Sequence, residues 1–469
     1  MSGAPTSEIP ALTEPIPVLA ERPRGRDLFL ALQISNYRLY AISQIFANTG
    51  GWMQRVAVDW LVLELTGNVA LVGLTVALQF APNLLLAPWA GVLSDRVDRR
   101  RILMLTQSAA FLVNALLAAL VLLGVAQAWM VFVIAGVQGA ILAIDGPSRA
   151  AFIGQLVGTR RLANAISLNA VIFHGGGLVG PALSGVLIAL IGSGWSIGIN
   201  AIASLVAVSA FLAMRRGDIV PTPRLPRARG QIRSAIGYAR RKTTIFWPLV
   251  LCAVVGTFGM NLPVLLTASA NETYGTGSAG YGLYSSLAAA GALLGALLSA
   301  RRRTLRLRTA VGWTFVYGLV TVVAGVTPWA VLFLPALVGI GLTRVTYAVA
   351  NDAMWQLSSN PGIRGRIASL QFGIVVGGQA LGGLVVGAIV ETFGPVVGFV
   401  VAGGVPAIAA VAIALHLARR HQLRLRVDRR SPRRFVTIVR RTEPIALAPL
   451  TAPTPIPVPP ATAPITLED

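Results

Sequence analysis

The chain has few of the residues that build reactive sites. Among its 469 residues it holds one cysteine, three histidines and 17 acidic residues. The single cysteine, Cys252, excludes a disulfide within the chain and any multi-cysteine metal site. The sequence contains no Walker phosphate-binding motif, so we expect no ATP-driven step, and we predict neither a cofactor nor a bound metal. These shortages speak against an enzyme active site. A membrane-embedded enzyme is therefore the less favoured hypothesis for this chain.

The chain instead contains many long apolar stretches. It is 55% hydrophobic and only 12% charged, which is too apolar for soluble domains. About 20 apolar residues can cross a hydrocarbon core of about 30 Å as a helix. Twelve stretches reach that length: 39–64, 69–90, 102–124, 130–148, 164–191, 196–214, 246–268, 280–300, 309–326, 330–352, 367–390 and 396–417. We therefore predict an all-α membrane protein with twelve transmembrane helices.

Lysine and arginine are confined to alternate segments between these helices. If both termini lie on one side, the segments on that side hold 37 of the 39 basic residues. The segments 64–70, 125–129, 269–279 and 391–395 hold none. By the positive-inside rule we expect both termini to be cytoplasmic in a plasma-membrane protein. The net charge of +22 then fits anionic lipids at the cytoplasmic face, and we expect no nucleic-acid partner.

A shift of 202 residues superimposes the two halves of the chain. It places the arginines at 99–101 on those at 301–303, and Gly176 on Gly378. A six-helix shift relates two bundles by an axis along the membrane normal. The predicted regions are an N-terminal cytoplasmic segment at 1–37, a first bundle at 38–214, a linker at 215–243, a second bundle at 244–417 and a tail at 418–469.

The regions outside the bundles have a distinct composition. The first 30 residues carry Glu8, Glu14 and Glu21 and several prolines before any apolar run, so we expect no cleaved signal peptide. Residues 232–241 of the linker are predicted to form a short basic amphipathic helix. The tail is first basic and then, from Pro444 onward, too rich in proline to build a core.

The segment at 91–101 reads GVLSDRVDRRR. A carboxylate at a helix end beside a basic cluster can gain charged partners in one conformation and lose them in another. The segment resembles the cytoplasmic signature of the major facilitator superfamily, with Asp98 in place of a second glycine. The matching residues are Gly91, Asp95, Arg96, Arg99 and Arg100. The resemblance implies a latch that closes the cytoplasmic side, with Asp145 and Arg149 as partners; the alternative is an ordinary positive-inside loop.

The helix predicted at 164–191 contains the run GGLVGPALSG. Small residues four apart let two helices approach closely, and proline permits a bend, so we expect a helix-packing hinge. The run resembles the antiporter signature of the same superfamily through Gly176, Gly180, Pro181 and Gly185. The run WMQRVAVDWLVLELTG at 52–67 looks most like the branch that contains enterobactin and macrolide exporters. An arginine usual in the family's fourth helix is replaced by Ala135.

Ionisable side chains inside the predicted spans are few. Arg55 and Asp59 lie four residues apart, so they share a helix face, where mutual pairing lowers the cost of burying either. The 202-residue shift places Asn261 opposite Asp59. Asp59 is the only carboxylate well inside a predicted span and is our candidate to exchange a proton for cargo, with Arg55 and His174 as the other candidates. A purely structural ion pair is the alternative.

These observations together favour a secondary transporter. We predict a monomer that exports an amphipathic small molecule (a drug, an antibiotic or a siderophore-like compound) by proton antiport and alternating access. An importer or symporter of the same fold is the alternative. Polar and aromatic residues on the spans are candidates to line a central cavity: Gln79, Asn83, Asn169, Asn261, Tyr281, Tyr284, Arg344, Gln371 and Gln379.

The charge pattern makes a direct prediction about orientation. In a Cys252→Ala background, a cysteine replacing Thr276 should react with an impermeant thiol reagent added outside cells, because its segment contains no basic residue. A cysteine replacing Ser94 should react only after the cells are permeabilised. The reverse labelling pattern would overturn the orientation.

Overall fold

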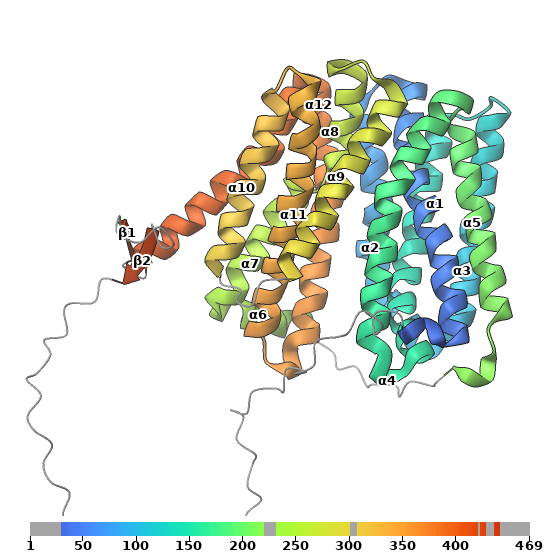
Figure 1. Ribbon diagram of the computed structural model, residues 1–469, viewed down its shortest axis with the longest axis horizontal. Helices are drawn as coiled ribbons and strands as arrows, with labels where there is room; N and C mark the ends of the chain where they lie inside the picture. Colours follow the sequence, from blue (N-terminus) through green and yellow to red (C-terminus); the bar gives the residue numbers. More distant parts are fainter. Residues whose placement is uncertain (1–29, 220–230, 301–306, 421–422, 428–435, 441–469) are drawn as a thin grey trace, which may run out of the picture. The chain divides into compact units, whose positions relative to one another are not determined.

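The computed structural model describes residues 30–219, 231–300, 307–420, 423–427 and 436–440. Nearly all of them are helical (Figure 1). The α-helices are α1 (Ser35–Thr66), α2 (Val69–Arg96), α3 (Arg99–Leu122), α4 (Ala128–Ile191), α5 (Ser193–Ala213), α6 (Gln231–Arg241), α7 (Thr243–Val254), α8 (Leu262–Ala268), α9 (Gly277–Ala300), α10 (Leu307–Val326), α11 (Ala330–Ser358) and α12 (Pro361–Arg420). Short helices are η2 (Arg216–Asp218), η3 (Val255–Gly259) and η4 (Ser269–Thr273), of which the last two are π-helical.

The predicted twelve-helix fold in two bundles is confirmed. Ten helical stretches of the described chain are long and apolar enough to span a membrane. One of them, Gly365–Arg419, is broken at Gly394 and so makes two crossings. The helix α1, 32 residues long and richer in polar side chains, completes the twelve. The regional boundaries drawn from the sequence stay predictions, and residues 1–29 and 441–469 lie outside the described residues.

Two of the expected loops are single-residue breaks inside long helices. The segment 149–163, expected to connect two spans, is helical on both sides of Gly158 (φ 65°, ψ 178°). The same happens at Gly394 (φ 83°, ψ 168°), in the segment 391–395. Both φ values lie in the region that glycine adopts at little cost. One glycine therefore suffices to reverse the chain, and the flanking helices extend further than their apolar residues alone predict.

The two halves do not follow one sequence shift throughout. A Cβ added to Gly176 would meet Asn48, and one added to Gly378 would meet Gly256. The glycines are 202 residues apart, but their partners are 208 apart. The first helices of the halves start at Ser35 and Thr243, which are also 208 apart. The first helical pair of the second half is thus displaced by six residues, and the shorter α9 (24 residues against 28 in α2) absorbs part of the difference.

The expected equivalence of Asn261 and Asp59 is therefore wrong. With the offset of 208 residues, Asp59 corresponds to Thr267. Asn261 is fully buried, and its side-chain amide donates a hydrogen bond to the Thr257 carbonyl oxygen (2.9 Å). A Cβ on Gly382 would lie 2.2 Å from that amide nitrogen. Asn261 thus belongs to the packing between the start of α8 and α12.

The predicted hinge residues serve two different contacts. Gly176 and Gly180 lie against α1: a Cβ on Gly180 would stand 2.7 Å from the Thr49 carbonyl oxygen. Pro181 and Gly185 instead lie against α9 of the other bundle, where a Cβ on Gly185 would approach Ser278 O to 2.7 Å. The hinge expected from the sequence therefore packs partly against α1 of its own bundle and partly against α9 of the other bundle.

The bundles meet through their backbones at one end. A Cβ on Gly282 of α9 would lie 2.4 Å from the Pro181 carbonyl oxygen of α4. A Cβ on Gly73 of α2 would lie 2.1 Å from the Gly383 carbonyl oxygen of α12. Real side chains do not tolerate such distances, so these positions require glycine. The end closed in this way is the one that carries the segments 64–70 and 391–395.

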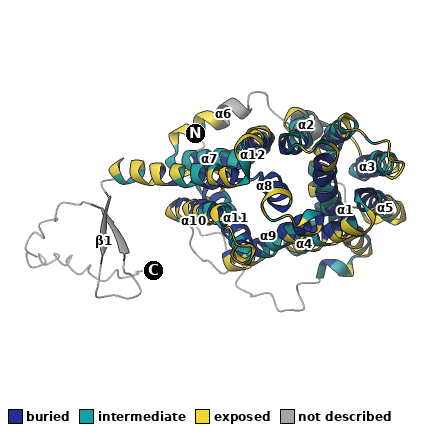
Figure 2. Ribbon diagram, turned by 90° about the horizontal axis from the view of Figure 1, so that it is seen from above, coloured by how far each residue is buried: buried dark blue, intermediate teal, exposed yellow. Residues whose placement is uncertain are grey.

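Aromatic side chains fill the core near the other end of the first bundle. Tyr37, Tyr40, Phe152 and Phe211 are fully buried and form one cluster contributed by α1, α4 and α5. Rings such as Tyr40 and Phe152 meet edge to face, a favourable arrangement for aromatic pairs. Buried residues gather where helices face each other, while exposed ones lie on the outward faces (Figure 2).

The second compact unit, Ile413–Asp469, holds the last turns of α12 and two antiparallel strands. They are β1 (Leu423–Val427) and β2 (Val436–Arg440), with Leu423 opposite Arg440. The sequence LRLRV of β1 alternates apolar and basic residues, which is the periodicity of a strand. The expected basic tail thus includes a hairpin that charge counting alone does not predict.

Closure of the glycine-lined end can be tested by adding a side chain. Gly282→Val should separate α9 from α4, because overpacking typically costs about 1–3 kcal/mol, which corresponds to about a fivefold or larger loss of the closed form. Spin labels on the exposed positions Val125→Cys and Trp329→Cys would report the distance between bundles in a Cys252→Ala background. Gly136→Val, at a site where a Cβ meets nothing within 4 Å, is the control and should leave the distances unchanged.

Candidate functional site: a charged cavity between the bundles

A cavity of about 150 Å³ lies between the two bundles, below the glycine-lined end. Charged and polar side chains from both bundles border it together with an apolar wall that includes Phe80 and Leu266. The polar and charged members are Arg55, Asp59, Gln79, Tyr281, Ser285, Arg344 and Gln379. The structure thus brings four of the predicted cavity residues (Gln79, Tyr281, Arg344 and Gln379) to the same space as two predicted coupling residues.

Asp59 connects the bundles. Its side chain is buried on α1, and its Oδ2 atom accepts a hydrogen bond from the Tyr281 hydroxyl group of α9 (2.8 Å). The rings of Trp60 and Tyr281 stack beside this bond, with centroids 6.4 Å apart. The Oδ1 atom of Asp59 is buried and has no hydrogen-bond partner in the described structure. A carboxylate with one free acceptor on a cavity wall can take up a proton or bind a donor from cargo.

Arg55 does not form the ion pair with Asp59 that their spacing predicts. No ion pair within 4.0 Å joins them in the described part of the chain, where the ion pairs are Arg101 to Asp98 and Arg149 to Asp145. The Arg55 guanidinium group lies over the Trp52 ring instead, 4.8 Å from the centroid. The helix spacing correctly places Arg55 and Asp59 on one face, but a stacking partner one turn earlier competes for the guanidinium group.

Five predicted cavity residues do not border the two cavities described for this chain: Asn83, Asn169, Asn261, Tyr284 and Gln371. Tyr284 is buried in a ring cluster with Tyr274 and Phe333. His174, the third coupling candidate, is half-buried, and its ring packs edge-on against Phe173 with centroids 5.5 Å apart. It is outside the lining of both cavities.

Gln371 belongs to a polar cluster that the sequence does not predict. Its side-chain amide donates to Asp352 Oδ1 (2.6 Å) and lies 3.8 Å from the Cys252 sulfur atom. The helix α11 continues to Ser358, six residues beyond the predicted span, so Asp352 lies inside it. Asp352 is the last residue of the predicted span at 330–352 and is followed by six more helical residues; the expectation that Asp59 is the only carboxylate well inside a span stays a prediction. The predicted span ends at residue 352 because the apolar run ends there, so hydropathy alone does not indicate that the helix continues to Ser358.

A second cavity, of about 230 Å³, lies inside the first bundle. Side-chain amides from four helices form a partly buried chain along it: Asn200 donates to Gln54, Gln54 donates to Asn114, and Gln138 also donates to Asn114. Arg55 and Gln79 border this cavity as well as the central one. No single-sequence motif signals this arrangement, because each helix contributes only one of the four amides.

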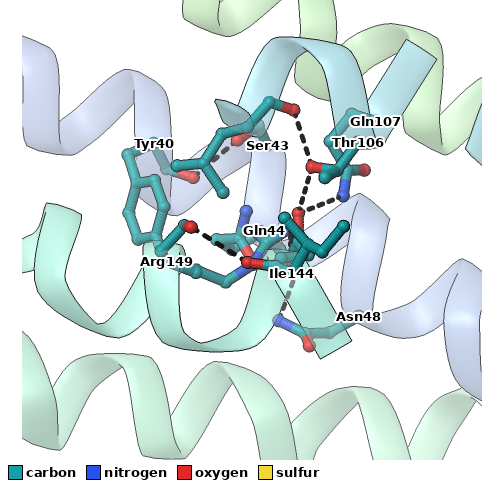
Figure 3. Close-up of polar contacts among 11 residues, drawn as sticks. Tyr40, Ser43, Gln44, Asn48, Thr106, Gln107, Ile144 and Arg149 are labelled. Carbon is teal, nitrogen blue, oxygen red and sulfur yellow. Dashed lines mark hydrogen bonds and ion pairs between the residues drawn. The ribbon is translucent and has the colours of Figure 1, made fainter. Parts of the chain in front are cut away.

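The residues expected to form a cytoplasmic latch are only partly described. Asp145 and Arg149 form an ion pair along α4 (2.7 Å), and Asp145 Oδ1 accepts from Thr106 (2.8 Å) and Gln107 (3.0 Å). Figure 3 shows Thr106, Gln107 and Arg149 converging at this point. The surroundings of Gly91 and the side chains of Asp95 and Arg96 lie outside what the structure describes. Whether Asp145 and Arg149 receive Asp95 stays a prediction.

The basic residues that follow have local roles. The Arg100 guanidinium group donates to the carbonyl oxygens of Phe211 (2.7 Å) and Leu212 (3.1 Å). It thereby caps the carboxyl end of α5, where a cation is favourable. Arg99 lies at the start of α3. Arg100 therefore has a structural task in this conformation, whatever it contributes to a latch.

A carboxylate closes the glycine-lined end. Glu391, in α12 before the break at Gly394, accepts a hydrogen bond at Oε2 from the Val69 backbone N–H of α2 (2.7 Å). Val69 is the first residue of α2, so an anion from one bundle caps a helix of the other. In the described structure, this bond and the one from Tyr281 to Asp59 are the hydrogen bonds between the bundles. Both lie toward the same end.

Comparison with known families agrees with this architecture. The profile of a family described as "Transmembrane secretion effector" matches residues 28–435. The matched region covers both bundles and the hairpin strand β1.

Two curated relatives resemble part of the chain. "Staphyloferrin A transporter" of Staphylococcus aureus (strain NCTC 8325 / PS 47) is 32% identical over 142 residues, which make up 30% of this chain and 36% of the relative. "Uncharacterized MFS-type transporter YfiS" of Bacillus subtilis (strain 168) is 26% identical over 148 residues, 31% of this chain and 34% of the relative. The chain thus spans about a third of the length of these relatives.

Solved structures share the fold at low identity. A transporter of the POT family superposes with a TM-score of 0.68 at 11% identity, covering 82% of this chain and 96% of that one. A bacterial homologue of the iron transporter ferroportin in an inward-facing state superposes with a TM-score of 0.64 at 16% identity, covering 81% and 98%.

The carboxylate cap at the closed end generates a testable expectation. Glu391→Gln should weaken closure, because a charge-assisted bond to a helix N-terminus is replaced by a neutral one, a loss of about 1 kcal/mol. The ratio of closed to open molecules should then fall by about fivefold, read as a longer distance between labels at Val125→Cys and Trp329→Cys. Glu272→Gln removes another carboxylate near Glu391 and should not reduce closure. Equal distances in both variants would exclude a gating role for Glu391.

Proposed function

The chain belongs to the transmembrane secretion effector family of the major facilitator superfamily, and we propose that it exports an amphipathic small molecule from the cell by proton antiport and alternating access. It is a multi-pass membrane transporter with two bundles around a central cavity. The family description as a secretion effector supports export. An importer or symporter with the same fold is the competing proposal.

The observation that carries the proposal is the position of Asp59. It is a buried carboxylate on the wall of the central cavity, and a hydrogen bond links it to Tyr281 in the opposite bundle. Intramembrane carboxylates are costly to bury and commonly serve proton transfer. Because the bond crosses between bundles, its geometry changes when the bundles rock. Asp59 can then exchange a proton in one conformation and contact cargo in the other.

The direction in which the cavity opens follows from orientation. If the segments without lysine and arginine face outward, the glycine-lined end is the outer end, and the described conformation is closed to the outside. Opening the outer side would break the backbone contacts at Gly73 and Gly282 and the cap that Glu391 places on α2. The expected latch at Asp95 would form in that outward-open state and hold the cytoplasmic side closed.

Siderophore-like cargo is one candidate within the amphipathic class. It is supported by the partial similarity to a protein named for staphyloferrin A transport. Drugs and antibiotics are the other candidates, as in multidrug efflux. A panel of dyes, macrolides, tetracyclines and siderophores, tested in an efflux-deficient host, would identify the cargo.

The coupling role of Asp59 can be measured in vesicles. Asp59→Asn should abolish cargo flux driven by an imposed pH gradient, because the amide cannot carry the proton, while cargo binding is retained. Tyr281→Phe keeps the carboxylate but removes its bond across the bundles, and we expect coupled flux to fall by about tenfold. The sign of the flux relative to the pH gradient separates antiport from symport.

Glu64→Gln is the matched control. Glu64 is a carboxylate five residues further along α1 that accepts from Trp60, outside the lining of the cavities. Its removal should leave coupling intact. Coupled flux that persists in a well-folded Asp59→Asn protein would assign coupling elsewhere, with His174 or Asp352 as the next residues to test.

A further inference from the structure

Two guanidinium groups border the central cavity from opposite sides. Arg55 belongs to α1 of the first bundle and Arg344 to α11 of the second. Both side chains are half-buried. In the described part of the chain, neither has a carboxylate within 4.0 Å, and the Arg55 contact is the face of the Trp52 ring.

Two other arginines of the same chain have protein acceptors. Arg149 is paired with Asp145 at 2.7 Å. Arg100 donates to two backbone carbonyl oxygens at the end of α5. The fold therefore provides partners where a buried guanidinium group has a structural task. Arg55 and Arg344 differ in that both line the cavity, and no ion pair with a protein carboxylate is found for either among the described residues.

The cavity wall carries a surplus of positive charge. Among the residues that line it, the charged groups are Arg55, Arg344 and Asp59. The sum is positive whether Asp59 is ionised or protonated. An uncompensated positive charge at membrane depth is unfavourable, so an anion that enters the cavity relieves it. We propose that the cargo carries a carboxylate group, which Arg55 and Arg344 bind from the two sides.

The remaining wall defines the rest of the cargo. Guanidinium groups present forked donors that match the two oxygens of a carboxylate. Gln79 and Gln379, one from each bundle, offer amide donors and acceptors for hydroxyl or amide groups. Phe80 and Leu266 supply apolar surface. The complementary molecule is an amphipathic carboxylate, and the ring of Trp52 holds the Arg55 guanidinium group in place for it.

The proposal rests on the proposed transport function and narrows its substrate class. A cycle that exports one anion moves negative charge out of the cell, which an inside-negative membrane potential favours. The same two arginines would also attract phosphate, either free or in a lipid headgroup. A test must therefore separate carboxylate from phosphate and from lipid.

Binding of fluorescent acids to the full chain in nanodiscs of zwitterionic lipid tests the carboxylate site. The probes are a series of N-dansyl amino acids of increasing side-chain size and their uncharged methyl esters. At least one acid should bind about tenfold or more tightly than its ester, since hydrogen bonds to charged groups are the strong ones. Arg344→Gln and Arg55→Gln should each remove that preference and leave ester binding unchanged, while Arg344→Lys should keep part of it.

Matched variants and competitors make the result decisive. Arg308→Gln, an exposed arginine on α10, should leave the preference intact. Inorganic phosphate or nanodiscs containing phosphatidylglycerol should not abolish it; complete displacement by either would show a phosphate or lipid site instead. If no acid in the series binds more tightly than its ester, the proposal is overturned. Flux is measured separately, so acid-selective binding without coupled flux would refute the transport mechanism and leave the carboxylate site standing.

Discussion

The arrangement of this molecule depends on the contact of backbone with backbone at Gly73 and Gly282. At each position an added Cβ would collide with a carbonyl oxygen of the opposite bundle, at 2.1 and 2.4 Å. Lipid provides no hydrophobic driving force between helices, so association relies on close packing of this kind. The two crossings, α2 with α12 and α4 with α9, close one end of the cavity and set the spacing of the side chains beneath it.

Charge inside the spans is divided between groups that the fold satisfies and groups that face the cavity. Asp145, Arg149 and Arg100 bind protein partners within the first bundle. Among the described residues, Arg55 and Arg344 have no carboxylate partner, and Asp59 uses only one of its oxygen atoms. The first kind stabilises one bundle as a rigid body. The second kind places hydrogen-bonding groups on the wall of the central cavity.

The sequence predicts the helices well because length, hydropathy and the distribution of arginine are properties of the chain alone. It also places Asp59, Arg55 and Arg344 on the cavity, since ionisable residues at membrane depth rarely face lipid. It fails where a contact depends on the partner helix. The Arg55 guanidinium group contacts Trp52 rather than Asp59. The predicted partner of Asp59 is wrong by six positions, and the shorter α9 (24 residues against 28 in α2) accounts for part of that difference. The cap of α2 by Glu391 joins residues 322 apart, which no local pattern can indicate.

The absence of an ion pair between Arg55 and Asp59 bears on the proposed proton coupling. An ion pair within one helix is the same in every conformation of a rigid bundle, so its protonation cannot report which side of the transporter is open. The hydrogen bond from Tyr281 in the other bundle does depend on the conformation of the transporter, because rocking of the bundles changes the distance between the donor and acceptor atoms. A ligand shifts a conformational equilibrium only by its differential affinity for the two states. A proton on Asp59 meets that condition through Tyr281, and it would not do so through Arg55.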